Sequence, residues 1–121
     1  MKKDLAFVIL IVAIIAAAYV GVSYTGLFTA AGTQDELAQC LTQKGVVMYG
    51  AYWCPHCANQ KAEFGPSFQY INSVECDPNG DNANPQLCQE KGVTGYPTWE
   101  INGQMYSGEQ SLERLASLAG C

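Results

Sequence analysis

Hydrophobic positions divide the chain into an apolar first quarter and a longer part in which apolar and polar segments alternate. The run from Leu5 to Val22, "LAFVILIVAIIAAAYVGV", carries no charged residue, and Lys2 and Lys3 precede it. As a helix this run would rise about 27 Å, close to the ~30 Å hydrocarbon core of a bilayer. The pattern therefore predicts a transmembrane helix within residues 1–24, with the two lysines on the cytoplasmic side.

A cleaved signal peptide is the alternative for the same segment. Ala16 and Ala18 offer small residues in an A-x-A arrangement behind a shorter apolar core. Both interpretations export the rest of the chain, so they differ only in whether that part stays tethered to the membrane. We expect residues 25–33 to form a linker and residues 34–121 to form one domain on the extracytoplasmic side.

Helix-like and strand-like segments alternate in the first half of this domain, which favours an α/β fold. A helix is expected to begin near Gln34, because Thr33 and Glu36 form a capping-box pattern in front of it. The apolar, β-prone run 46–53 predicts a strand that is buried on both faces. A second helix should start at Pro55, since proline is well tolerated at the first helical position.

The second half of the domain predicts the remaining strands. Residues 70–76 form a candidate second strand, and "TWEI" and "QMYS" within residues 98–107 flank an Asn-Gly pair typical of a two-residue hairpin. A closing helix is expected from about Ser111, where apolar residues recur with helical spacing. Together these segments predict a central mixed sheet of about four strands flanked by helices.

Composition places this small domain in an oxidising compartment. The chain has six cysteines in 121 residues and a formal net charge of −5. Cysteine-rich small domains that are exported usually carry disulfides. The acidic balance excludes a nucleic-acid surface, which would need clustered basic residues.

The segment "WCPHC" carries the candidate chemistry. Cys54 would stand at the N-terminus of a helix, where unpaired N–H groups and the helix dipole stabilise a thiolate. Cys57, one turn later, can attack a mixed disulfide on Cys54 and release the substrate. His56 lies between them and can offer a hydrogen bond or positive charge to the Cys54 sulfur. The pattern predicts thiol–disulfide exchange by these three residues, with a redox-active disulfide in place of a bound cofactor.

Other uses of the pair are weaker. A zinc site would need a second close pair of cysteines, whereas Cys76 and Cys88 are twelve positions apart, so no metal is expected. A different class is a non-catalytic anchored module whose cysteines only stabilise it. Within the same chemistry, the alternative is a reductase or isomerase supplied by a membrane electron donor.

Three longer segments extend the pattern beyond the cysteine pair. "MYGAYWCPHCANQKAEFG", "ECDPNG" and "GVTGYPTWEINGQMYSG" resemble the thioredoxin-like domain that is fused to, or partnered with, bacterial vitamin K epoxide reductase homologues. The resemblance covers about residues 34–120 and implies a DsbA-like thiol-disulfide oxidoreductase with a thioredoxin-like fold. It implies that Cys54 and Cys57 exchange disulfides with exported cysteine-containing proteins and are reoxidised by a quinone-linked membrane partner.

The resemblance also assigns roles around the cysteine pair. It implies that Tyr96 and Pro97 form a cis-proline loop that faces the pair and binds substrate. Trp53, next to the pair, is expected to line the same groove. One departure stands out: Met48 lies six residues before Cys54, where thioredoxins and DsbA-type oxidases carry a buried acid that helps to move protons. We therefore expect another group, such as water or a partner residue, to deprotonate the second cysteine.

Four cysteines remain for structural bonds. The matching domains carry cysteines at both positions corresponding to Cys76 and Cys88, so the resemblance implies a disulfide between them. Pairing Cys40 with Cys121 would join the first helix of the domain to the end of the chain. An intermolecular bridge is the rival for this second pair.

Overall fold

The chain divides into two compact units, Met1–Gly32 and Thr33–Cys121, and each is described by itself. The computed structural model describes the backbone of residues 2–25 and 30–121 and the side chains of residues 4–19 and 34–121. Of the linker expected at residues 25–33, residues 26–29 lie outside the described residues, whereas Thr25 ends the first helix and residues 30–33 begin the second.

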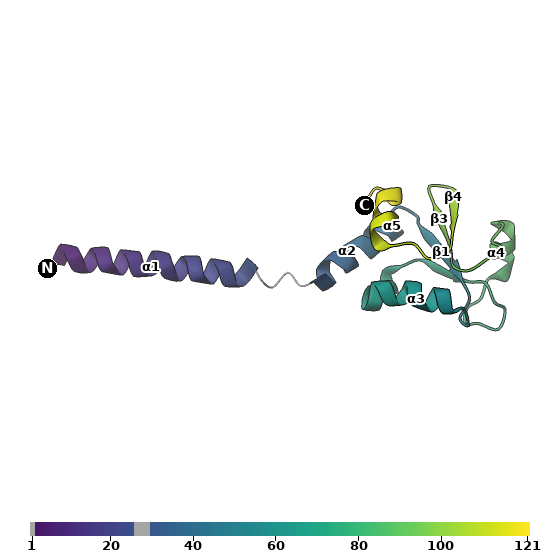
Figure 1. The fold of residues 1–121 in the computed structure, drawn as a ribbon, viewed down its shortest axis with the longest axis horizontal. Coiled ribbons are helices and arrows are strands. Elements are labelled where there is room, and N and C mark those ends of the chain that lie inside the picture. Colours follow the sequence, from purple (N-terminus) through teal and green to yellow (C-terminus); the bar gives the residue numbers. More distant parts are fainter. Residues whose placement is uncertain (1, 26–29) are drawn as a thin grey trace. The chain divides into compact units, whose positions relative to one another are not determined.

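The first unit contains one long helix, α1, Lys2–Thr25 (Figure 1). Its described side chains, residues 4–19, are all exposed. Within the part of the chain that the structure describes, no helix is long and apolar enough to cross a membrane. The predicted span continues through Val22, and the side chains of residues 20–24 lie outside the described ones.

The second unit is built on a four-stranded mixed sheet with the order β2-β1-β3-β4. Its strands are β1 (Val47–Gly50), β2 (Ser73–Glu75), β3 (Thr98–Ile101) and β4 (Gln104–Ser107). β1 and β2 are parallel, whereas β1 pairs with β3 and β3 with β4 in antiparallel fashion. The expected α/β architecture and the number of strands are confirmed, and the hairpin turns at the Asn-Gly pair, where both residues have positive φ.

Two strands are shorter than the apolar runs that predicted them. The run 46–53 yields a strand of four residues, because the chain leaves the sheet after Gly50 to bring Cys54 to the start of a helix. The run 70–76 yields only Ser73–Glu75, because a 3-10 helix, η1 (Gly65–Tyr70), takes up its beginning. Only some of the flanking apolar residues are buried: Val46, Ala51 and Ile71 belong to the core, whereas Tyr52, Trp53 and Tyr70 are exposed.

The helices surround this sheet (Figure 1). They are α2 (Ala30–Gln43), α3 (Pro55–Phe64), α4 (Pro85–Glu90) and α5 (Leu112–Ala119). α2 begins earlier than the start predicted near Gln34, because the alanines at its N-terminus are strong helix formers.

Two hydrophobic clusters form the core, one for each face of β1. Met48 belongs to the larger cluster, which joins α2, α3 and α5 to β1 and β3 and includes the fully buried Trp99. Tyr49, the next residue, belongs to the smaller cluster with Cys76 and Cys88. Successive side chains of a strand point to opposite faces, so the two clusters lie on opposite sides of the sheet.

Candidate active site

Cys54 lies at the junction between β1 and α3, as its N-cap residue. Its side chain is 5% exposed, and Pro55 follows at the first helical position. The backbone N–H of Cys57 donates a hydrogen bond to the Cys54 sulfur, with 3.4 Å between nitrogen and sulfur. A donor at a helix N-terminus favours negative charge on this sulfur.

Cys57 lies in the first turn of α3 and is 1% exposed. Both cysteines of the pair are free thiols in the structure. Burial raises the pKa of the Cys57 thiol well above its usual range, and the neighbouring Cys54 adds to this, while a hydrogen bond with the Ala51 backbone and the charge of Lys61 oppose it. The Cys57 thiol is therefore protonated at neutral pH and must lose a proton before it can act as a nucleophile.

The loop before β3 faces the pair. The peptide bond between Tyr96 and Pro97 is cis, and Pro97 is fully buried. The thiol of Cys54 donates to the Tyr96 carbonyl oxygen, 3.6 Å away. The Pro97 carbonyl accepts from the backbone N–H of Gly108 at 2.7 Å, which anchors the loop to the end of β4. The cis-proline loop thus lies directly against the sulfur of Cys54.

An exposed aromatic surface surrounds this contact. Tyr52 and Trp53 are 59% and 57% exposed, although they directly precede the buried Cys54. The Trp53 ring meets Tyr96 edge-on, with 6.1 Å between ring centroids. Its indole Nε1 donates to Oδ2 of Asp77 at 2.7 Å. We call Trp53 and Tyr96 the aromatic surface below.

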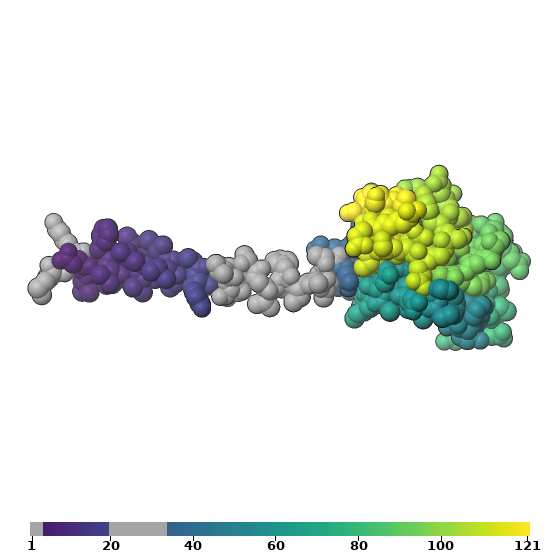
Figure 2. Space-filling view, in the orientation of Figure 1, coloured from purple at the N-terminus to yellow at the C-terminus, as the bar shows by residue number. Residues whose placement is uncertain are grey.

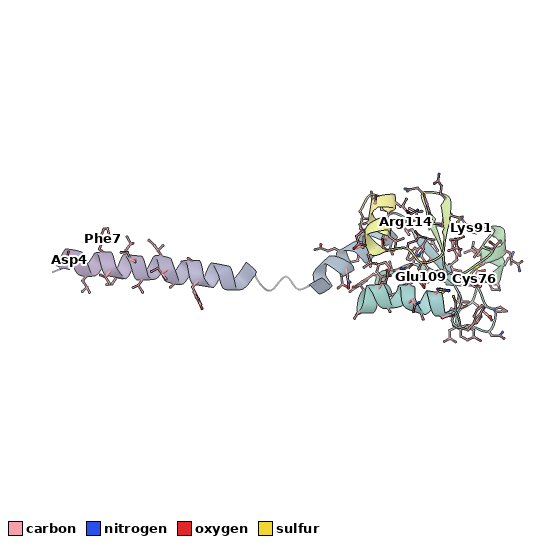
Figure 3. All side chains as sticks on the ribbon, in the orientation of Figure 1. Asp4, Phe7, Cys76, Lys91, Glu109 and Arg114 are labelled. Carbon is pink, nitrogen blue, oxygen red and sulfur yellow. A yellow bond between two sulfur atoms is a disulfide. The ribbon has the colours of Figure 1, made fainter. Side chains whose placement is uncertain are left out.

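His56 is exposed and turns toward the loop between β4 and α5. Its Nδ1 lies 2.8 Å from Oε1 of Glu109, which Asn59 also contacts through Nδ2 at 3.1 Å. The hydrogen bond with His56, followed by that with Asn59, holds the pKa of Glu109 below its usual value. Glu109 is labelled beside α3 in Figure 3. From the sequence we expected His56 to interact with the Cys54 sulfur. In the structure, its Nδ1 instead contacts the carboxylate of Glu109.

A buried amide fixes the helix that carries the pair. Gln60 is fully buried, and its Oε1 accepts from Trp99 Nε1 at 3.1 Å and from the backbone N–H of Gln110 at 2.7 Å. Its Nε2 donates to the Gln110 carbonyl at 2.9 Å. These bonds join α3 to β3 and to the segment before α5. In Figure 2 the yellow surface of the C-terminal residues lies against the teal surface of α3.

The four remaining cysteines form two disulfides, Cys76–Cys88 and Cys40–Cys121, with Cα–Cα distances of 5.8 and 6.1 Å. These are the pairs named from the sequence, and both lie within the chain. Sulfurs that are bonded to each other are not zinc ligands. Among the described residues, no group of three or more His, Cys, Asp or Glu side chains could hold a metal ion.

Sequence reasoning missed Asp77 and Glu109. Each is a partner of a residue that was singled out, but Asp77 lies 24 positions from Trp53 and Glu109 lies 53 positions from His56. Helical or strand periodicity does not reach across such separations, so only the folded arrangement brings these partners together.

Comparison with known proteins supports this picture. No family model matches the chain. The chain is 41% identical over 88 residues to "Thiol-disulfide oxidoreductase LTO1" of Arabidopsis thaliana, an alignment that covers 69% of this chain and 23% of that protein. It is 34% identical over 85 residues to "Protein disulfide isomerase-like 2-2" of Oryza sativa subsp. japonica, covering 59% and 22%. It is 32% identical over 81 residues to "Probable protein disulfide-isomerase ER-60" of Schistosoma mansoni, covering 60% and 17%.

The names of these relatives all describe enzymes that act on disulfides. The four-stranded mixed sheet with its flanking helices fits a thioredoxin-like fold. The names of the relatives support thiol–disulfide oxidoreductase activity for this domain. The chain spans about a quarter or less of the length of these relatives.

Proposed function

We propose that this chain is an extracytoplasmic thiol–disulfide oxidoreductase that transfers disulfides to exported proteins through Cys54 and Cys57. One observation carries the proposal: the Cys54 sulfur lies at a helix N-terminus and 3.6 Å from the carbonyl of Tyr96 in the cis-proline loop. The exposed aromatic surface borders the same sulfur. The Cys54 sulfur, the backbone of the cis-proline loop and an apolar surface that could hold a peptide therefore lie side by side.

The exchange uses two displacements at sulfur. In the oxidised pair, a substrate thiolate attacks the Cys54 sulfur, the Cys54–Cys57 bond breaks, and Cys57 leaves as a thiolate that takes up a proton. A second substrate thiolate then attacks the substrate sulfur of the mixed disulfide, and Cys54 leaves as a thiolate that accepts the Cys57 N–H hydrogen bond. The substrate gains a disulfide and the pair gains two electrons, which leaves Cys54 as a thiolate and Cys57 as a thiol.

We propose that Tyr96, Pro97 and Trp53 bind the substrate. The backbone of Tyr96 would pair with an extended substrate segment, while Pro97 holds the loop against the pair. The exposed Trp53 ring offers apolar area that tolerates many sequences. His56, in the pair's helix, would add positive charge near Cys54 when protonated, with Glu109 fixing its ring.

The partners follow from the compartment. Two intrachain disulfides suit an oxidising environment outside the cytoplasm. The apolar segment 5–22 would direct export, either as a retained anchor or as a cleaved signal peptide. We propose that a quinone-linked membrane partner of the vitamin K epoxide reductase type reoxidises the pair, which then needs no bound cofactor.

The reduction potential of the pair tests this proposal. The full chain in detergent would be equilibrated with glutathione buffers, with Cys54→Ser as the control that cannot form the pair. A potential of about −120 to −180 mV supports transfer of disulfides to substrates, whereas about −270 mV or lower indicates a reductase. If the pair is neither oxidised nor reduced across the glutathione buffers, the result would instead favour a non-catalytic binding module. If His56 stabilises the Cys54 thiolate, His56→Ala should lower the potential, because the reduced form of the pair then loses that stabilisation.

A further inference from the structure

A cleft of about 390 Å³ opens beside the buried cysteine of the pair. Its lining includes Met48 and Gly50 of β1, Lys61 of α3, Glu75 of β2 and Asp81 of the following loop. A water molecule takes up about 30 Å³ in the liquid, so a cleft of this size has room for several. Charged groups therefore meet solvent close to a thiol that is itself almost fully buried.

Gly50 lines this cleft and also lies against the Cys57 sulfur. A Cβ atom built on Gly50 would lie 3.0 Å from the Cys57 sulfur and 3.3 Å from Cε of Met48. The backbone of the cleft wall thus lies against the sulfur with no side chain between them. A larger residue at position 50 would push the sulfur away from the cleft.

Glu75 is the strand neighbour of this glycine. The parallel register of β1 and β2 pairs Gly50 with Glu75 and Met48 with Ser73. Paired positions point to the same face of a sheet, and adjacent strands are about 4.8 Å apart. The Glu75 side chain therefore enters the cleft one strand away from the residue that touches the Cys57 sulfur. The backbone N–H of Asp77 donates to its Oε1 at 2.9 Å, which holds the carboxylate in place.

The other ionisable groups near Cys57 are less suited to accept its proton. Cys54 is the partner in exchange, and the positive charge of Lys61 on α3 stabilises a thiolate without taking a proton. Asp81 also lines the cleft, but it lies on an exposed turn and not on the strand beside Gly50. The buried neighbour on β1, Met48, has no ionisable group.

We propose that Glu75 exchanges the proton of Cys57 through water in this cleft. The inference rests on the proposed function, because it assigns the proton transfer that the exchange requires. When the pair closes, the Cys57 proton passes through water to the Glu75 carboxylate. The Cys57 thiolate then attacks the Cys54 sulfur of the mixed disulfide, the Cys54–Cys57 bond forms, and the substrate leaves as a thiolate. When the pair opens, Glu75 returns the proton to the departing Cys57 thiolate.

Glu75→Gln tests the assignment in the full chain. The reduced protein would be mixed with oxidised glutathione, quenched with acid at intervals, and the fraction carrying one glutathione measured by intact mass spectrometry across a pH series. Cys54 should be glutathionylated at the wild-type rate, whereas closure by Cys57 should slow about tenfold or more, so that the mixed disulfide accumulates. Glu75→Asp should restore part of the closure rate.

Asp81→Asn is the matched control, because it removes one negative charge from the same cleft, and its closure rate should equal that of the wild type. A purely electrostatic role of Glu75 predicts the opposite sign, since loss of a nearby negative charge favours the Cys57 thiolate and would speed closure. Closure by Glu75→Gln at or above the wild-type rate, or equal slowing by Asp81→Asn, overturns the assignment and leaves the proposed function intact. A wild-type protein that forms no mixed disulfide overturns both.

Discussion

The indole Nε1 of Trp53 donates a hydrogen bond to Oδ2 of Asp77 across 2.7 Å. Asp77 directly follows Cys76, which is bonded to Cys88. The backbone N–H of Asn79 donates to the other carboxylate oxygen of Asp77 at 2.8 Å, so the acceptor is held in a fixed orientation. An exposed ring beside the reactive sulfur is therefore positioned by a loop that the buried disulfide closes.

Asp77→Ala should weaken substrate binding without changing the pair itself. Loss of this hydrogen bond leaves the Trp53 ring without its fixed orientation, so we expect KM for a cysteine-containing peptide to rise roughly twofold to tenfold. The reduction potential should stay at the wild-type value, because Asp77 does not contact either sulfur of the pair. Steady-state oxidation of the peptide gives KM, and glutathione equilibration gives the potential.

Asp77→Asn is the control for this prediction, since its amide oxygen can still accept from the indole. An unchanged KM in Asp77→Ala would show that the orientation of Trp53 does not matter for binding.

The two cysteines of the pair should differ in trapping. Cys57→Ser leaves Cys54 able to form a mixed disulfide but removes the group that resolves it, so substrate should accumulate on Cys54. Cys54→Ser leaves only Cys57, which is 1% exposed, and should trap little or nothing. Acid quenching followed by mass spectrometry under non-reducing conditions would measure the trapped fraction. Equal trapping by both variants would contradict the assignment of Cys54 as the sulfur that substrate attacks.

Features that depend on neighbouring positions could be predicted from the sequence. The spacing of Cys54 and Cys57, with Pro55 after the first, places both at the start of a helix because proline fits the first helical position. The alternation of segments likewise predicted a four-stranded mixed sheet. The resemblance, and not the spacing, pointed to the cis bond before Pro97, which the structure contains.

Features that depend on register or on distant loops could not be predicted. The pairing of Gly50 with Glu75 is set by how β1 and β2 align, and a shift of one residue would turn the carboxylate to the other face. The contact of His56 with Glu109 joins the start of α3 to a loop near the end of the chain. Nothing in the local pattern around either residue indicates its partner.

Alkaline pH should destabilise the reduced protein through Cys57. Burial raises its pKa in the folded state above that of an unfolded thiol, about 8.5. The contribution to stability is therefore complete below that pH and is lost as pH rises toward the folded pKa, by at most about 1.4 kcal/mol per pH unit. Urea denaturation of the reduced protein near neutral pH and at alkaline pH would measure the loss.

Cys57→Ala provides the comparison, because all other titrating groups are shared. Its stability should fall less with pH than that of the reduced wild type. Parallel pH profiles for the two proteins would mean that Cys57 has the same pKa in the folded and unfolded states.

On the opposite face of the sheet, Glu100→Gln should destabilise the domain. Glu100 accepts from the hydroxyl of Tyr49 at 2.7 Å and from Nζ of Lys91, labelled in Figure 3, at 2.8 Å. Tyr49 is 1% exposed, and its burial, reinforced by Glu100, raises the pKa of its hydroxyl. A glutamine keeps one acceptor oxygen for two donors, so we expect a loss of about 1–3 kcal/mol in the free energy of unfolding.

Acid pH and a second variant separate the contributions of Glu100. Its hydrogen bonds with Lys91 and then Tyr49 lower the pKa of Glu100, so the stabilisation is present above the unfolded value of about 4.3 and is lost as pH falls through the folded pKa. The gap between wild type and Glu100→Gln should therefore narrow in acid. Lys91→Met removes only the ion pair, whose lysine side chain is 41% exposed, and should cost about 0–1 kcal/mol. Urea denaturation followed by tryptophan fluorescence would give all three values, and an equal loss in both variants would mean that the buried Tyr49 hydroxyl adds nothing to the stability of the fold.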